Sequence, residues 1–575
     1  MKRVKIIAFL LLLGTPVLAG TEIMPLKDIR PGMKGYGLSV FKGVKIERFD
    51  VEIITVSRKT RPRSGMIWAR ISGHPDIEKA GVIAGMSGSP VYINNKLIGA
   101  LAFSGSFLKE ALAGITPIED MLDILKKEDT RTSSGYVPPP EGKQYASSDG
   151  LRSIKVPLVI GNGSENLVSL YRNELEQMNF IPMTADSYSN FDQLEIPRKF
   201  EPGSAVGIYL MTGDLTLSGI GTVTYTNGNK VLVFGHPMHF SGGSDCPLAH
   251  AYIHTVIPGL DRSFKMGTST KIVGRTYQDQ LAGVAGVLNQ QADMLPVQVN
   301  YDFFNTRGKY NYHIIRNNNY LPNLLSIAVY SALEMLGSFQ EKNTLDFTFE
   351  ITLDKGKKLE ISNTMSSLTT ADSLKNSMQY LLTPLANLLN NKFENVRIEN
   401  VKADIGIKSR IHVAEIKKII APKRAYHPGE TVELKVKLKP YRGEEFYRNI
   451  SIQLPANLED KKFTLIVSSD PEREYVDYLL SPQKYNPQSL EQLIRLYNSL
   501  PRATDLAVWS VTKDKGVVIN GEIMNKLPGS YYSILQDSLD SSSDRSLMQI
   551  KNKIPVDYIV VGACSLTLEI KNPNE

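Results

Sequence analysis

Short apolar runs rich in β-branched residues, separated by turn residues, fill residues 24–125 of this chain. The runs FDVEIITVSR, GMIWARIS and SPVYINNKLIGAL each have the length and composition of a strand. The adjacent asparagines Asn94 and Asn95 predict a hairpin turn inside the last of these runs. Successive runs of this kind predict a mainly β fold here.

One short helix and a linker are expected to follow these strands. The segment ITPIEDMLDILKK predicts a helix with Thr116 as N-cap, Pro117 at the first helical position and Glu119 three residues after the cap. Residues 127–150 are polar and contain three consecutive prolines, which is typical of a linker.

Residues 151–290 return to strand patterns, with one helix near their start. The run KVPLVI predicts a strand and SENLVSLYRNELEQM a helix, and the intervening GNG favours a turn with an N-cap over a phosphate loop, because no Walker lysine follows. The runs SAVGIYLMTG, GIGTVTYT and KVLVFGH predict three more strands. Asn227-Gly228 between the last two predicts a hairpin.

The remainder of the chain changes character twice. Residues 291–406 alternate strand, strand and helix two times, which predicts an α+β domain and suggests an internal duplication. Residues 407–575 return to β-rich patterns, with a helix, SLEQLIRLYNSL, among the closing strands of 480–575, and are expected to form a β-sandwich-like region. A chain of 575 residues is too long for one core, so several domains are expected.

The N-terminus has the pattern of a secretory signal peptide. MKRVK is basic, IIAFLLLL is apolar, and PVLAG supplies small residues for cleavage after Ala19, so residues 1–19 are expected to be removed on export to the periplasm or the extracellular space. The apolar run is shorter than the roughly 20 residues that span a bilayer, and no membrane span is expected after cleavage. A net charge of +7, without a dense Lys/Arg tract, argues against nucleic-acid binding.

The hexapeptide GMSGSP places Ser87 on a glycine-rich turn. A serine becomes nucleophilic when a base takes its proton and backbone N–H groups stabilise the oxyanion. Gly85 permits a backbone turn that directs the N–H groups of Gly85 and Ser87 into one hole. The alternative is a serine in a structural turn.

A histidine is the expected base, because no lysine partner is evident. Four of the eight histidines lie in FGHPMHFSGGSDCPLAHAYIH, residues 234–254. His236 follows an apolar strand and lies between Gly235 and Pro237, where a rigid scaffold often carries a catalytic side chain on a loop. A buried histidine satisfied by a backbone carbonyl is the alternative.

Three segments together resemble the SpoIVB family of serine peptidases. GMSGSPVYINNKLIGAL followed by GITPIEDML is similar to the family's serine segment, GIGTVTYTNGNKVLVFGHPM to its histidine segment, and SFKMGTSTKIVGRTYQDQLAGVAGVL to the stretch after it. The resemblance implies a serine endopeptidase with two chymotrypsin-like β-barrel halves, residues 20–126 and 151–290. It implies Ser87 as nucleophile and His236 as general base.

The chain departs from the family pattern in three ways. The serine segment precedes the histidine segment, as in a circular permutation, and no PDZ-like domain precedes the histidine segment. The family's aspartate, in a Thr-Asp-Pro before the serine turn, has no counterpart, since Ser72-Gly73 stands there. Asp76 is the preferred candidate acid and Asp279 the alternative; either could be a surface carboxylate.

Two other functions compete with the peptidase. His236, His239, His250 and His254, with Asp245 and Cys246 between them, have spacing that could bind zinc in a metal-dependent hydrolase. Alternatively, the chain is a non-catalytic envelope scaffold with a degenerate peptidase fold. For the peptidase we expect no cofactor, a protein or peptide substrate, and envelope protein partners contacted through the C-terminal domains. Cys246 and Cys564 could pair, and the sequence does not decide this.

Overall fold

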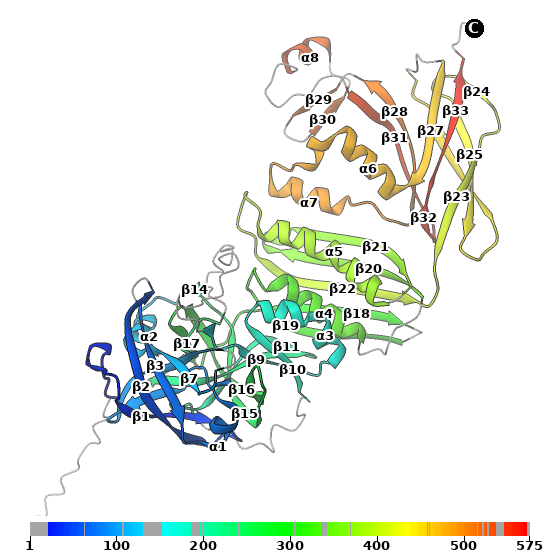
Figure 1. The fold of residues 1–575 in the computed structure, drawn as a ribbon. Helices are drawn as coiled ribbons and strands as arrows, with labels where there is room; N and C mark the ends of the chain where they lie inside the picture. Colours follow the sequence, from blue (N-terminus) through cyan, green and yellow to red (C-terminus); the bar gives the residue numbers. More distant parts are fainter. Residues whose placement is uncertain are drawn as a thin grey trace, which may run out of the picture.

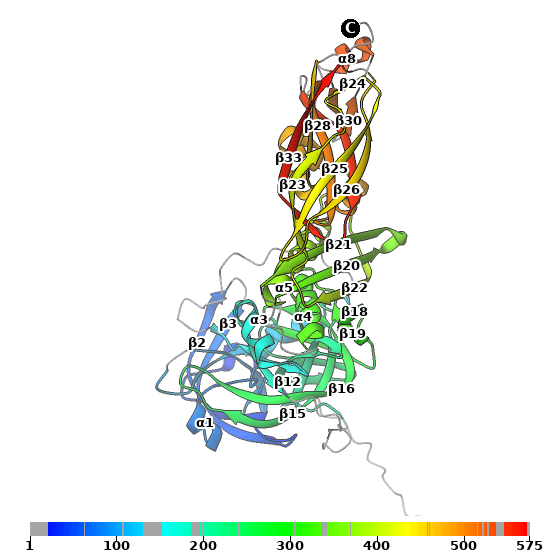
Figure 2. The ribbon, with the colours of Figure 1, turned by 90° about the vertical axis from the view of Figure 1, so that its right-hand side faces the viewer.

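The computed structural model describes residues 21–571, with gaps at 62–63, 106–107, 130–151, 186–195, 198, 239–241, 304–305, 335–341, 369, 457, 459–460, 515, 520–521, 526–527 and 536–544. The expected signal peptide, most of the expected linker and His239 lie outside the described residues. The chain forms a row of β-rich bodies, with the first strands at one end and the last strands at the other (Figures 1 and 2). The expected mainly β fold with chymotrypsin-like barrels and an α+β region is confirmed.

The first body is a closed barrel of six strands. Its hydrogen-bonded order is β1-β2-β3-β7-β6-β5, and β5 pairs with both β1 and β6 to close the ring. The strands are β1 (Lys34–Val40), β2 (Ile46–Arg61), β3 (Ser64–Ser72), β5 (Pro90–Ile93), β6 (Lys96–Ser104) and β7 (Leu112–Pro117). Helix α1 (Pro75–Ala80) and the short strand β4 (Ile83–Ala84) connect β3 to β5, helix α2 (Ile118–Leu125) follows β7, and β8 (Arg152–Ser153) pairs with β6.

The second body repeats this topology. Its order is β11-β12-β13-β17-β16-β15, and the pairing of β15 with β11 closes the ring. The strands are β11 (Ala205–Gly213), β12 (Thr216–Asn227), β13 (Lys230–Val233), β15 (Pro247–Ile257), β16 (Ser263–Gln280) and β17 (Gly283–Leu288), with β14 (Gly242–Gly243) between the third and fourth. In both barrels the strands, counted along the chain, are arranged 1-2-3-6-5-4 around the ring.

The α+β layer continues the sheet of the second barrel. Strand β19 pairs with β11, so the barrel and the layer share one 15-stranded sheet across the boundary expected at residue 290. The layer comprises β18 (Met294–Phe303), β19 (Thr306–Ile315), α4 (Leu321–Glu334), β20 (Asn343–Leu353), β21 (Lys358–Ser367), α5 (Thr370–Leu389) and β22 (Ile398–Lys408). The unit β9 (Val156–Gly161), α3 (Glu165–Gln177) and β10 (Phe180–Ala185) extends the sheet beyond β12.

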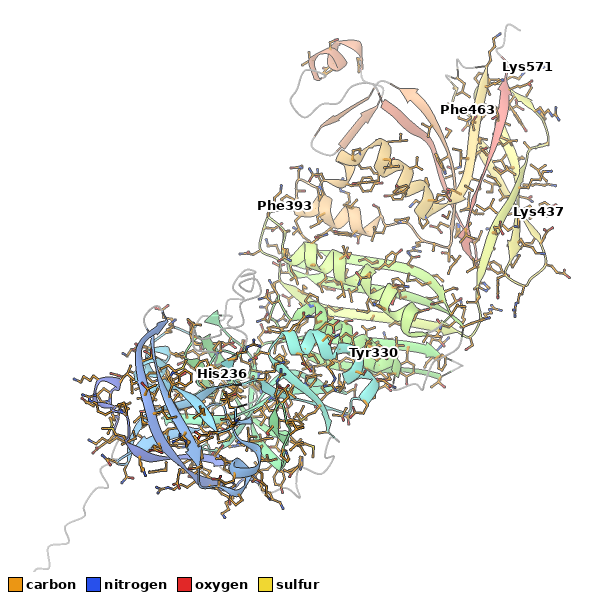
Figure 3. The ribbon with its side chains drawn as sticks, in the orientation of Figure 1. His236, Tyr330, Phe393, Lys437, Phe463 and Lys571 are labelled. Atoms are coloured by element: carbon orange, nitrogen blue, oxygen red, sulfur yellow. The ribbon has the colours of Figure 1, made fainter. Side chains whose placement is uncertain are left out.

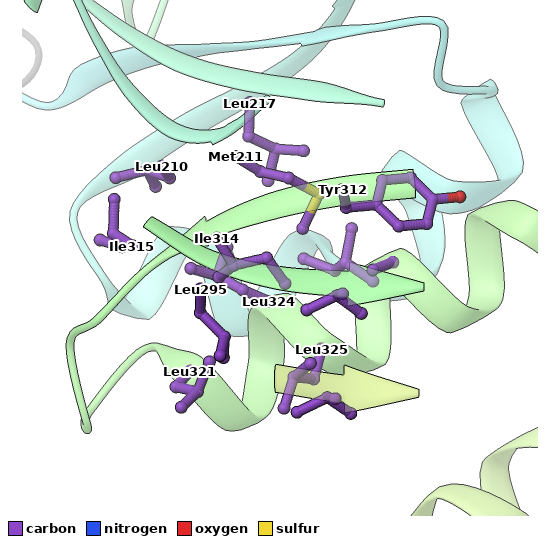
Figure 4. Packing of buried hydrophobic residues seen from close by; sticks show 14 of the residues in the cluster. Leu210, Met211, Leu217, Leu295, Tyr312, Ile314, Ile315, Leu321, Leu324 and Leu325 are labelled. Carbon is purple, nitrogen blue, oxygen red and sulfur yellow. The ribbon is translucent and has the colours of Figure 1, made fainter. Parts of the chain in front are cut away.

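One apolar core joins the barrel to the layer. Figure 4 shows Met211 and Leu217 of the barrel strands packing with Tyr312 of β19 and Leu324 of α4. The same buried cluster includes Leu493 of a helix near the C-terminus, α7 (Leu490–Asn498). The barrel carrying His236, the layer and this helix are therefore packed together rather than connected only through the chain.

The C-terminal region is built on two facing sheets. One has the order β26-β25-β23-β32 and the other β24-β33-β27-β28-β31, and a separate apolar core lies between them. The strands are β23 (Val413–Ile420), β24 (Ala425–Tyr426), β25 (Thr431–Pro440), β26 (Phe446–Gln453), β27 (Lys462–Ser469), β28 (Asp505–Asp514), β31 (Arg545–Pro555), β32 (Ile559–Val561) and β33 (Ala563–Ile570). Helix α6 (Asp470–Leu480), hairpin β29 (Gly516–Ile519) and β30 (Glu522–Asn525), and α8 (Gly529–Leu535) complete it.

Local sequence signals are confirmed except at one helix start. Asn94 and Asn95 both have positive φ, 50° and 61°, as a two-residue hairpin turn requires. Ser164 caps α3 by accepting a hydrogen bond from Leu167 N–H. The predicted start of this helix is wrong: Thr116 and Pro117 belong to β7, α2 begins at Ile118, and the Thr116 hydroxyl donates to the Gly235 carbonyl at 2.6 Å instead of capping α2.

Candidate active site

Ser87 and His236 lie on equivalent connections of the two barrels. Ser87 follows β4 and precedes β5, and His236 follows β13 and precedes β15, so each lies between the third and fourth strands of its barrel. Figure 3 places His236 within the body formed by the two barrels. The repeated topology thus brings the two loops to one interface, although 149 positions separate the residues in the chain.

The turn carrying Ser87 depends on two glycines with positive φ. Gly85 has φ 96° and Gly88 has φ 97°, values that strain any residue with a Cβ. A Cβ at Gly88 would lie 2.0 Å from the Thr222 carbonyl oxygen and 2.5 Å from the Phe234 nitrogen. Gly88 is therefore required both for the turn and for the close approach of the second barrel.

The N–H groups of this turn divide into two sets. Those of Met86, Gly88 and Ser89 donate to the carbonyls of Ile83, Leu101 and Met86. The N–H groups of Gly85 and Ser87 are the pair that the sequence predicts for an oxyanion hole.

Side chains and backbone of the second barrel hold the turn in place. Thr222 donates twice, from its N–H to the Ser87 carbonyl and from its hydroxyl to the Gly85 carbonyl, both at 2.9 Å. The Thr224 hydroxyl donates to the Gly88 carbonyl at 2.7 Å. Just before the turn, β4 pairs in parallel with the start of β16. Because these bonds fix the peptide planes around Ser87, they also fix the point from which its side chain leaves the backbone.

The Ser87 hydroxyl and the His236 imidazole are in direct hydrogen-bond contact through Oγ and Nε2. On the other side of the ring, Nδ1 lies 2.8 Å from the Pro237 carbonyl, which can only accept a proton. Neutral His236 therefore carries its proton on Nδ1 and presents a lone pair on Nε2 to Ser87. This is the tautomer that a general base needs.

A second acceptor competes for the Ser87 proton. The Phe234 carbonyl oxygen lies 2.9 Å from Ser87 Oγ. Phe234 has φ 69°, and Gly235 N–H donates to the Val233 carbonyl, so Phe234 is the centre of a γ-turn that strains a bulky residue.

Ser87 and His236 are both 0% exposed. A substrate can reach the pair only if part of the surrounding structure moves.

The two candidate acids lie in different surroundings. Asp279, near the end of β16, is 1% exposed, and its Oδ1 accepts the Met238 N–H at 3.0 Å, two residues beyond His236. Asp76, on α1, is 39% exposed at its side chain, and its carboxylate lies 3.7 Å from Nδ1 of His74. Asp279 is therefore attached to the histidine loop, whereas Asp76 is part of a helix terminus with His74.

Of the four candidate histidine ligands, His236, His250 and His254 lie among the described residues, and these three do not form a metal-binding cluster. His250 and His254 lie on strand β15 rather than on a helix; His250 packs against Phe200, and His254 Nε2 contacts the Thr268 hydroxyl. Within the part of the chain that the structure describes, no three His, Cys, Asp or Glu side chains could hold one metal ion. Cys246 and Cys564 are both free, and burial raises the pKa of the Cys246 thiol to about 12.

Sequence reasoning missed the residues that brace the turn. Thr222 and Thr224 alternate along β12, a pattern that indicates a common face but not what that face contacts. Lys265 lies in an ordinary strand run, SFKMGT, and the structure buries it completely beside the turn. The feature that could have drawn attention to Lys265 is a charged residue within a run that otherwise has the pattern of a buried strand.

Two barrels of one topology, with a serine and a histidine in contact between them, define a mainly β protein of the chymotrypsin-like class. A comparison with known families adds to this: residues 20–122 match the model of the SpoIVB peptidase family S55, so this part of the chain is similar to the serine peptidases of that family. The match includes Ser87 and ends before the histidine segment. No curated protein and no solved structure matches the chain. No helix among the described residues is long and apolar enough to cross a membrane.

Proposed function

We propose that the protein is an endopeptidase in which Ser87 attacks a peptide carbonyl while His236 takes its proton. The N–H groups of Gly85 and Ser87 stabilise the resulting oxyanion, and His236 returns the proton to the leaving amine, so that an ester to Ser87 Oγ remains. Water then attacks the ester, His236 takes a proton from the water, and the carboxylic product leaves with Ser87 restored.

The observation that carries this proposal is the contact between Ser87 Oγ and His236 Nε2. It joins two loops from different barrels, and the Pro237 carbonyl selects the tautomer that accepts the serine proton. A structural serine needs only a backbone acceptor such as the Phe234 carbonyl, 2.9 Å from Ser87 Oγ, and the imidazole contact is additional to it.

Asp279 is the acid that we assign to this site in preference to Asp76. It is buried, belongs to the same barrel as His236, and holds the segment after the histidine through Met238. A buried carboxylate at this place favours the imidazolium that forms during the reaction. His74, which stacks on Phe41 at 3.7 Å between ring centroids, has a structural role.

A fluorophosphonate probe tests the proposal, because it reacts with activated serines and not with ordinary ones. We expect the probe to label the wild-type chain on the peptide that contains Ser87. Ser87→Ala should abolish the label and His236→Ala should slow it by at least about 10²-fold. Ser451→Ala, which alters an exposed serine of the C-terminal region, is the matched control and should be labelled like the wild type.

Three results would separate the alternatives. Absence of Ser87-dependent labelling in folded protein would support a non-catalytic scaffold. Peptide hydrolysis that EDTA abolishes and the probe does not affect would support a metal-dependent hydrolase. Labelling that survives EDTA and requires both Ser87 and His236 supports the peptidase.

Export and substrate recruitment are further parts of the proposal. The signal-peptide pattern in residues 1–19 supports export to the periplasm or the extracellular space, and mass spectrometry of the mature protein should find Gly20 as the first residue. The C-terminal region is docked through α7 on the layer that continues the second barrel, which supports a role in positioning protein substrates or envelope partners.

A further inference from the structure

Lys265 is a completely buried lysine at the interface of the two barrels. It lies near the start of β16, directly after the two residues that pair with β4. Its ammonium donates to the Ser39 hydroxyl at 2.8 Å and lies 5.6 Å from the centre of the Phe41 ring. Among the described residues, no carboxylate is within ion-pairing distance of it.

Burying the amine of this lysine lowers the stability of the folded chain. Lysine is almost never fully buried without a charged partner, because its ammonium loses its hydration. Burial accordingly lowers the pKa of Lys265 to about 7. A methionine at the same place would fill the same space without this cost, so the amine calls for a reason other than stability.

The contacts of Lys265 lie on both sides of Ser87. Its methylene groups pack under Gly85, two residues before the serine, where an added Cβ would lie 3.1 Å from Lys265 Cδ. Its amine reaches Ser39, and Ser39 also accepts a hydrogen bond at 2.9 Å from Ser89, two residues after the nucleophile. Lys265 thus contacts Gly85, before Ser87, directly, and it is linked to Ser89, after Ser87, through the Ser39 hydroxyl.

We propose that Lys265 is a positioning residue that holds the Ser87 turn in its reactive conformation, through Gly85 on one side and the Ser39–Ser89 hydroxyl pair on the other. This inference rests on the proposed function of Ser87. The lysine touches no reacting atom. It acts by keeping the Gly85 and Ser87 N–H groups and the serine hydroxyl in fixed relative positions, which the chemical step needs and substrate binding does not.

The test measures fluorophosphonate labelling of Ser87 in the full-length chain, with the maximal rate constant and the half-saturating probe concentration determined separately. For Lys265→Met we expect a rate constant lowered about 10-fold and an unchanged half-saturating concentration. Its thermal midpoint should be equal to or higher than that of the wild type, because no amine remains to be desolvated. Ser39→Ala should give a similar loss, and the double variant should lose little more than either single variant.

Lys155→Met provides the matched control. Lys155 is also largely buried, with 13% of its side chain exposed, but it pairs with Glu176 of α3 and not with the serine turn. It should keep the wild-type rate constant.

A folded Lys265→Met variant with the wild-type rate constant would overturn the inference, as would additive losses in the double variant. If Lys265→Met does not fold, Ser39→Ala decides: the wild-type rate in folded Ser39→Ala overturns the inference, and a 10-fold loss supports it. Wild-type protein without any Ser87-dependent label refutes the proposed function itself and, with it, this inference.

Discussion

At the scale of single residues, the proposed site gives His236 two supports, a backbone carbonyl and a carboxylate that holds its loop. The Pro237 carbonyl contacts Nδ1, and Asp279 holds the next residue but one. In a serine peptidase whose aspartate alone orients the ring, an amide in its place costs roughly 10⁴-fold in rate. Because part of that orientation is supplied here by the backbone, the loss on removing the Asp279 charge should be smaller.

We therefore expect Asp279→Asn to slow labelling of Ser87 by at least about 10-fold and by less than about 10⁴-fold. The asparagine keeps an oxygen that can accept the Met238 N–H, so the loop should stay in place and only the charge is removed. Asp76→Asn is the comparison, and it should label within about twofold of the wild type, since among the described residues Asp76 contacts its own helix terminus and His74 rather than the His236 loop. Slower labelling of Asp76→Asn than of Asp279→Asn would show that Asp76, and not Asp279, is the acid.

Lys265 also makes a prediction about pH and stability. Its pKa falls from 10.5 in the unfolded chain to about 7 in the folded protein through burial alone. Between these values the unfolded chain binds more protons, so the free energy of unfolding rises with pH, by up to about 1.4 kcal/mol per unit. Denaturant titrations at pH 7 and 9 should show the wild type gaining stability relative to Lys265→Met. An equal change in both proteins would show that the amine titrates normally.

At the scale of elements, the serine turn shows two reasons for a glycine: the positive φ of its backbone and the lack of space for a Cβ. Gly88 and Gly228 both have positive φ, but a Cβ at Gly88 meets the backbone of Thr222 and Phe234, whereas a Cβ at Gly228 meets nothing within 4 Å. Gly228→Ala should cost about 1 kcal/mol, the strain of a left-handed residue. Gly88→Ala should cost several times more and abolish labelling, as calorimetry and the probe would measure. Equal costs would mean that the barrels can separate at Gly88 without loss.

The elements also show what a sequence can predict and where prediction stops. Hairpins at Asn94-Asn95 and before Lys230 follow from local backbone preference, and sequence reasoning placed them correctly. Thr116 has the right type and spacing for a cap, but its hydroxyl is used by Gly235 of the other barrel. The prediction that Ser87 and His236 meet came from a resemblance to a family, because no local pattern encodes a contact between residues 149 positions apart. Burial of Lys265 depends on three elements at once, and the one local sign of it is a charged residue within a run that has the pattern of a buried strand.

At the scale of the whole molecule, the reversed order of the serine and histidine segments has a structural explanation. Both barrels have the strand arrangement 1-2-3-6-5-4, and each carries its candidate catalytic residue between the third and fourth strands. When two bodies have the same topology, either can come first in the chain and still present the same connection to its partner. The geometry of such a site is defined in space and not by chain order.

If the site is held by the barrel interface, the connection between the barrels can be cut. Tyr92, Ile118 and Met121 of the first barrel share a buried cluster with Leu232 and Tyr277 of the second, and β4 pairs with β16. We expect a chain with a protease site inserted in the predicted linker, within residues 131–150, to run as one species in gel filtration after cleavage. It should also label Ser87 at the uncleaved rate, because an apolar interface closed by strand pairing keeps the two fragments together.

The uncleaved insertion variant is the control. Fragments that elute separately, or labelling that disappears on cleavage, would show that the chain connection, and not the interface, brings Ser87 and His236 together.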